Sequence, residues 1–147
     1  MKVVLGSDHA GYEIKTAVGR FLAARGIEVD DVGTFSTESV DYPDFAEKVG
    51  HAVVEGRADR GVLVCGTGMG VCIAANKIHG IRAAAPWNPD TARLSRQHNN
   101  ANVLCLPGRH LTEPLALDIL AIWLETPFDG GRHQRRLDKI TRLEQSD

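Results

Sequence analysis

A cysteine followed at once by a glycine-rich turn is the part of this sequence best suited to chemistry. Cys65 comes after the apolar residues 61–64, which are typical of a buried strand, and before Gly66-Thr67-Gly68-Met69-Gly70. A strand, a glycine-rich turn and a helix start together form an anion site, because unpaired N–H groups and the positive end of the helix dipole point at one spot. The stretch therefore predicts a thiol at the mouth of an anion-binding loop.

The spacing leaves several interpretations of this loop open. A dinucleotide loop needs G-x-G-x-x-G, and Val71 stands where the third glycine would fall. A cysteine phosphatase loop needs an arginine six residues past the cysteine, and that position is again Val71. A loop that stabilises an oxyanion while Cys65 moves a proton is compatible with the spacing. A tight turn around a buried, inert cysteine is the structural alternative and the usual outcome for a lone cysteine.

Composition narrows the class of protein. The 147 residues predict a single domain over residues 1–147, and 43% hydrophobic with 24% charged residues is typical of a globular protein. The net charge of -2 gives no reason to expect nucleic acid or an anionic membrane as partner. No apolar run is long enough for a secretory signal or a bilayer span. Three cysteines without metal-ligand spacing predict a reduced, cytoplasmic chain.

Short apolar segments alternate with helical patterns along the chain. We expect strands at residues 3–6, 27–29, 61–64, 81–85 and 103–106, and helices at residues 13–25, 43–55, 71–76, 89–98, 115–125 and 132–144. Asp41, Asn88 and Thr112 are the predicted N-caps. The alternation predicts an α/β fold, an open, doubly wound sandwich around a five-stranded parallel sheet.

The last predicted helix differs from the others. Leu137, Ile140 and Leu143 form one narrow apolar stripe, which indicates a C-terminal helical arm that packs partly on another subunit. Arg132 and Arg136 are four residues apart and share one helix face. Such pairs are usually solvated surface, but a phosphate group needs a fork of this kind.

In doubly wound sheets ligands bind beyond the carboxyl ends of the strands. By this rule we single out Asp8 and His9 after the first strand, residues 65–70 after the third, His98 at the end of the helix before the fifth strand, and Arg109 just past that strand. Asp8 could equally be a helix cap. His98 could be a helix C-terminal histidine favoured by the dipole, or an acid/base group near neutral pH. The other two cysteines are predicted to be core residues.

Several ordered motifs carry a resemblance to a known family. They are residues 7–11 (SDHAG), 41–44 (DYPD), 65–68 (CGTG), 74–77 (AANK), 95–99 (SRQHN) and 131–133 (GRH). Together they resemble the B-type ribose-5-phosphate isomerases, a family that also includes the allose- and galactose-6-phosphate isomerases. The match runs nearly end to end. It implies a Rossmann-like three-layer fold, a homodimer or dimer of dimers, and isomerisation of a sugar phosphate without metal or cofactor.

The resemblance also implies roles for residues. Cys65 corresponds to the proton-transferring base and His98 to the group that opens the sugar ring. The substrate-binding positions correspond to Asp8, His9, Gly66, Thr67, Gly68, Met69, Gly70, Asn99, Arg109, Arg132 and Arg136. One family branch uses a glutamate just after the glycine-rich loop, but Val71 stands there, so the thiol branch is the better match. Tyr42 lies in a family motif, with its role left open.

The expected chemistry is the interconversion of ribose 5-phosphate and ribulose 5-phosphate through an enediolate, in the non-oxidative pentose phosphate pathway. Backbone amides of the glycine-rich loop would meet the negative oxygen. A hexose 6-phosphate is the alternative substrate. A nucleotide-binding domain is a weaker alternative, because Asp30-Asp31 would fit a ribose-binding acid but residues 7–11 lack the glycine fingerprint. A receiver-type signalling module would need an aspartate where Cys65 stands.

Overall fold

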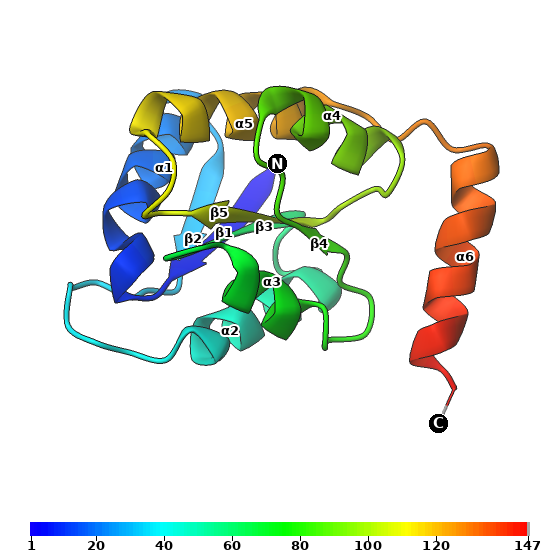
Figure 1. Cartoon of the computed structure of the whole chain (residues 1–147), viewed down its shortest axis with the longest axis horizontal. Helices are drawn as coiled ribbons and strands as arrows, with labels where there is room; N and C mark the ends of the chain where they lie inside the picture. Colours follow the sequence, from blue (N-terminus) through cyan, green and yellow to red (C-terminus); the bar gives the residue numbers. More distant parts are fainter. Residues whose placement is uncertain (147) are drawn as a thin grey trace.

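The computed structural model describes residues 1–146 and shows a five-stranded sheet between two layers of helices (Figure 1). The strands pair in parallel in the order β2-β1-β3-β5-β4. Their bounds are β1 Lys2–Ser7, β2 Glu28–Asp31, β3 Arg60–Cys65, β4 Ala83–Ala84 and β5 Val103–Pro107. This is the predicted doubly wound α/β sandwich with an all-parallel sheet.

Helices cover both faces of the sheet. One face carries α1 (Tyr12–Ala24), α4 (Pro89–Gln97) and α5 (Glu113–Glu125), and the other carries α2 (Tyr42–Val54) and α3 (Met69–Ala75) (Figure 1). A short 3-10 turn, η1 (His9–Gly11), joins β1 to α1. Within residues 1–146, every helix is too short or too polar to reach across a lipid bilayer.

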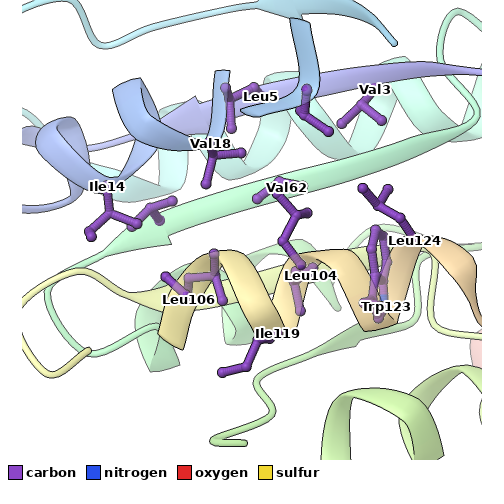
Figure 2. Packing of buried hydrophobic residues seen from close by; sticks show 14 of the residues in the cluster. Val3, Leu5, Ile14, Val18, Val62, Leu104, Leu106, Ile119, Trp123 and Leu124 are labelled. Atoms are coloured by element: carbon purple, nitrogen blue, oxygen red, sulfur yellow. The ribbon is translucent and has the colours of Figure 1, made fainter. Parts of the chain in front are cut away.

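Two hydrophobic clusters hold these layers together, one on each face of the sheet. Figure 2 shows the larger cluster, where side chains of α1 and α5 meet those of β1, β3 and β5. Trp123 of α5 is fully buried there. The three central strands β1, β3 and β5 are buried on both faces, which explains why they appear in the sequence as continuous apolar runs.

The predicted helix caps have different outcomes. Asn88 forms a capping box with Thr91 at the start of α4, and the Thr112 side chain accepts a hydrogen bond from Leu115 at the start of α5. Both predictions are confirmed. Asp41 stands at the N-cap of α2, as predicted, but its side chain makes no capping hydrogen bond.

The fourth strand is shorter than residues 81–85, because asparagine side chains bind its backbone. Asn102 Oδ1 accepts the N–H of Arg82 at 2.8 Å, and Asn76 Oδ1 accepts the N–H of Ala83 at 2.8 Å. Only Ala83–Ala84 pair with β5. Side chains thus take the place of a longer backbone ladder.

The last helix, α6 (Arg132–Glu144), stands away from the sandwich as an arm (Figure 1). Its bounds agree with the prediction. Near its far end the Glu144 carboxylate accepts a hydrogen bond from Gly80 N–H, at 3.0 and 3.1 Å to the two oxygens. Leu137 of its apolar stripe is buried, but Ile140 is 44% and Leu143 is 72% exposed. The stripe is therefore only partly covered within one chain.

Candidate active site

The carboxyl ends of β1 and β3 lie side by side at the point where the sheet reverses its winding. The chain leaves β1 toward α1 on one face, and it leaves β3 toward α3 on the other. Ser7 is paired with Val64, so Asp8 and Cys65 follow neighbouring positions. Ligands in doubly wound sheets bind at such a switch point. The first group of predicted residues therefore lies where this fold places its ligand site.

Asp8 and His9 are held tightly in the turn after β1. The Asp8 carboxylate is nearly buried and accepts the N–H of Gly11 at 3.0 Å, so it caps η1 as one interpretation predicted. His9 Nδ1 accepts the N–H of Val40 at 3.2 Å. A neutral imidazole whose Nδ1 accepts carries its proton on Nε2. His9 is thus set up as a hydrogen-bond donor through Nε2.

The glycine-rich loop brings its backbone and Arg109 together. The Gly108 N–H donates to Cys65 O at 2.8 Å and the Arg109 N–H to Gly66 O at 3.1 Å, which fixes the segment after β5 beside the loop. A Cβ placed on Gly66 would lie 3.5 Å from the Arg109 guanidinium. Gly68 adopts a left-handed conformation with φ 74° and packs on the backbone of β5, where a side chain would crowd Leu106.

Amides of this loop remain available to a ligand. The Met69 N–H donates to Thr67 Oγ1 at 3.3 Å. Among residues 1–146, no protein atom accepts a hydrogen bond from the N–H of Gly66, Thr67, Gly68 or Gly70. Unpaired donors gathered in one turn are suited to a negative oxygen. The backbone of this loop therefore has the free donors that the predicted anion-binding loop requires.

Cys65 is the last residue of β3, as predicted, but its thiol is more covered than a position at the loop mouth suggests. The residue is 4% exposed and belongs to the smaller hydrophobic cluster, together with Cys105 of the neighbouring strand. Side chains alternate along a strand, so residues 63 and 65 both point to the face covered by α2 and α3. The thiol therefore belongs to the core on that face of the sheet, and a small part of the residue remains exposed.

Tyr42, whose role the sequence left open, lies against this loop. A Cβ added to Gly70 would come within 2.7 Å of Tyr42 Cζ, so the phenol ring packs directly on that glycine. Tyr42 begins α2 and is 40% exposed. The fold thus adds an aromatic ring beside the free amides.

His98, Asn99, Arg132 and Arg136 do not join this group within one chain. A helix that connects parallel strands runs against them, so its carboxyl end lies at the amino edge of the sheet. His98 caps α4 there, and nearby Asn102 O accepts the N–H of Gly61 at the start of β3. Cys65 is at the other end of that strand, about 13 Å from Gly61 at 3.3 Å per residue. The carboxyl-edge rule therefore fails for His98 and Asn99.

At the amino edge, a second set of polar side chains meets between α4 and α6. The rings of His98 and His133 stack with centroids 4.3 Å apart and planes inclined by 14°. The Asp129 carboxylate also lies in this cluster, whose possible ligand atoms are all within 4.8 Å of one another. Nearly parallel rings cannot share one metal ion, because each nitrogen binds a metal in the plane of its own ring. The arrangement is suited to ring stacking instead.

Positive charge dominates this corner. Arg132 and Arg136 both lie exposed on α6, as the predicted fork requires. The pKa of His133 is lowered, first by burial and then by the charges of His98, Arg132 and Arg136, while Asp129 acts against them. His133 was not predicted as a site residue. The motif at residues 131–133 contained it, but only the fold shows that it meets His98.

Asp31, the last residue of β2, has a structural partner. Both oxygens of Asp31 accept hydrogen bonds from Lys15 Nζ, at 2.8 and 2.7 Å, and Lys15 is 1% exposed. The ribose-binding acid that a nucleotide site would need is thus engaged with a buried lysine.

Comparisons with known proteins show which family the chain belongs to. Residues 3–140 match the model of the family described as Ribose/Galactose Isomerase. The chain is 47% identical over 144 residues to the ribose-5-phosphate isomerase B of Escherichia coli K12, which covers 98% of this chain and 97% of the relative.

Solved structures are similar over nearly the whole chain. A Clostridium thermocellum ribose-5-phosphate isomerase B superposes with a TM-score of 0.98 at 53% identity, covering 99% of this chain and 98% of the other. The Mycoplasma genitalium ribose-5-phosphate isomerase B, solved with bound ribulose-5-phosphate, gives a TM-score of 0.96 at 43% identity, with 99% and 97% covered. The chain belongs to the ribose/galactose isomerase family.

Proposed function

We propose that this chain interconverts ribose 5-phosphate and ribulose 5-phosphate, as a step of the non-oxidative pentose phosphate pathway in a reducing cytoplasm. The observation that carries the proposal is Cys65 at the switch point of the sheet, directly before a loop whose amides are free to donate. The named activities of the relatives support the substrate, since one is solved with ribulose-5-phosphate bound. The three free cysteines agree with a reducing location.

In this mechanism Cys65 acts as the base. Its thiolate removes the proton from C2 of the open-chain aldose, and the electrons move so that the C1 carbonyl oxygen becomes the oxygen of an enediolate. The proton of the O2 hydroxyl group passes to O1, the proton held by Cys65 returns to C1, and a ketone forms at C2. Free N–H groups at residues 66–70 donate to the negative oxygen, and the loss of one such donor typically costs about 3 kcal/mol of barrier. The low exposure of Cys65 keeps the abstracted proton from exchanging with water.

The amino-edge residues would prepare and hold the substrate. Pentose 5-phosphates are mainly ring-closed, so His98 acts as acid and base in opening the ring before proton transfer. Arg132 and Arg136 bind the phosphate, and that remote binding energy orients the carbon chain over the base. At the carboxyl edge of the sheet, Asp8 and His9 bind the hydroxyl groups of the sugar or its phosphate.

The residues around Cys65 and those around His98 lie at opposite edges of one sheet. We therefore propose that one site is formed by residues from two copies of the chain. A homodimer, or a dimer of dimers, would bring the amino-edge corner of one chain to the carboxyl edge of its partner. Large exposed apolar side chains support such an interface: they include Met69, Ile73, Trp87, Ile140 and Leu143. Asn99, Ile140 and Leu143 also line a cavity of about 540 Å³ beside α6.

The test is an isomerase assay on a panel of pentose 5-phosphates and hexose 6-phosphates, with and without EDTA. We expect turnover of ribose 5-phosphate that EDTA leaves unchanged. Cys65→Ala should fold and bind substrate, while kcat falls by about 100- to 10,000-fold. Cys72→Ala removes a nearby thiol and is the matched control. Near-normal kcat in Cys65→Ala would exclude the thiol as base.

A hexose 6-phosphate is the second candidate substrate, since the matching family is described for galactose as well as ribose. The same panel separates the two, because a hexose-specific enzyme would turn over allose 6-phosphate or galactose 6-phosphate with the higher kcat/KM. A nucleotide function has less support, because Asp31 is paired with Lys15.

A further inference from the structure

The stacked pair of His98 and His133 carries an inference about a residue that has no role in the mechanism above. His133 is 6% exposed and lies one residue into α6, whereas His98 caps α4 on a different segment of the chain. Two imidazole planes at 14° and 4.3 Å form an extended face-to-face contact. A contact of this kind restricts how the His98 ring can turn.

The backbone around the pair fixes its geometry. The Asp129 N–H donates to Gln97 O at 3.1 Å, and Arg96 Nε donates to Thr126 O at 3.2 Å. Arg96 is nearly buried and also binds Ala101 O at 2.7 Å. The segment before α6 is therefore tied to the end of α4 at two points, which sets His133 against His98.

The charges that face the pair favour a neutral His133. Arg132 and Arg136 belong to its own helix, His98 comes from α4, and Asp129 from the segment before α6 is the one acid among them. Burial and the positive neighbours hold the pKa of His133 below its usual value. A neutral His133 can stack on His98 in either protonation state of His98, without placing two positive rings face to face.

We propose that His133 is a positioning residue that holds the His98 ring, by stacking in its neutral form, in the orientation used to open the sugar ring. This rests on the proposed function, in which His98 is the ring-opening group. What His133 supplies is a flat aromatic surface rather than a proton or a ligand atom. Another uncharged aromatic ring at position 133 should therefore be able to replace the histidine.

Two variants separate the ring surface from the ring nitrogens. His133→Phe keeps a flat aromatic ring, and His133→Ala removes it. We expect kcat of His133→Ala to fall by about 10- to 100-fold, the loss typical of a misplaced catalytic group. His133→Phe should recover most of that loss, with KM within a few-fold of the wild type. His51→Ala on α2, an exposed histidine on the opposite face, is the matched control.

An NMR readout makes the test independent of the activity. Protons above an aromatic ring are shielded, so the ring protons of His98 should move downfield in His133→Ala and stay shielded in His133→Phe. Thermal melts of each variant identify a loss of folding. If the wild-type protein has no isomerase activity, the proposed function is wrong. The NMR comparison would still test whether His133 holds the His98 ring by stacking.

Two results would overturn the proposal. Equal impairment of His133→Phe and His133→Ala, with both folded, would mean that a nitrogen of His133 acts rather than its surface. Unchanged His98 shifts together with near-normal kcat in His133→Ala would mean that the stack does not hold His98.

Discussion

At the scale of single residues, the three thiols of this chain lie in one neighbourhood but in different environments. Cys105 is fully buried, and burial raises its pKa well above the ordinary value. Cys72 is half-buried, and a hydrogen bond with Cys105 lowers its pKa to about 7, against the effect of burial. Cys65, the proposed base, is nearly covered. Reactivity toward a thiol reagent is therefore a poor guide to which cysteine moves protons.

Alkylation at graded pH should show this difference. The thiolate is the reacting form, so a lowered pKa means that labelling of Cys72 by iodoacetamide rises as the pH increases through about 7. Cys105 should stay unlabelled in the folded protein. Peptide mass spectrometry measures both sites. A fast phase of alkylation that survives in Cys72→Ser would contradict the prediction. Experiments that alkylate Cys65 should use the Cys72→Ser variant as their background.

At the scale of elements, the site depends on how closely the turn after β1 packs on the end of β3. A Cβ added to Gly11 would lie 2.4 Å from Val64 O, in the strand that ends at Cys65. Backbone cannot move aside as a flexible side chain can. The small residue at this position therefore sets the spacing between Asp8 and the glycine-rich loop.

A pair of glycine substitutions tests this packing. Gly11→Ala should lower the free energy of unfolding by about 2 kcal/mol or more, because the methyl group overlaps the backbone of β3. Gly19→Ala in α1 meets only Leu5 at 3.5 Å and should stabilise the helix by about 0.5–1 kcal/mol. Urea unfolding measures both. If the Gly11→Ala protein is as stable as the Gly19→Ala protein, the turn after β1 can move to accommodate the methyl group, and the prediction is wrong.

Most elements could be predicted because their signals are local. The side chains of Asn88 and Thr112 cap helices by accepting backbone N–H groups three residues further on, and apolar runs mark the buried strands. The fourth strand was overpredicted, since Asn76 and Asn102 bind its backbone from distant positions. The stack of His98 on His133 joins residues 35 positions apart, and spacing along the chain gives no signal for such a contact.

At the scale of the whole molecule, the sequence could name the predicted site residues but could not assemble them. Asp8, His9, the glycine-rich loop and Arg109 gather at one edge because each directly follows a strand. His98 follows a helix, and helices that connect parallel strands end at the opposite edge. The proposed chemistry therefore requires a second chain that brings that corner to Cys65, and one sequence contains no record of a partner's position.

The exposed stripe of α6 should hold that partner. Replacing Ile140 and Leu143 together by Asp should convert a dimer to monomers and abolish turnover, because two charges would enter an apolar interface. Both side chains are partly or largely exposed in one chain, so its melting temperature at low concentration should change little. Light scattering after size exclusion gives the mass. Lys139→Asp on the same helix is the control, and a dimeric double variant would refute the role of the stripe.

The shared site itself is tested most directly by a mixed dimer of Cys65→Ala and Arg136→Ala chains, co-expressed with two different tags and purified through both. One of its sites would carry both substitutions and the other would be intact. We predict about half of the wild-type activity, while each variant alone is nearly inactive. If every site is built from a single chain, both sites carry one lesion, and activity no higher than that of the parent variants would contradict the account.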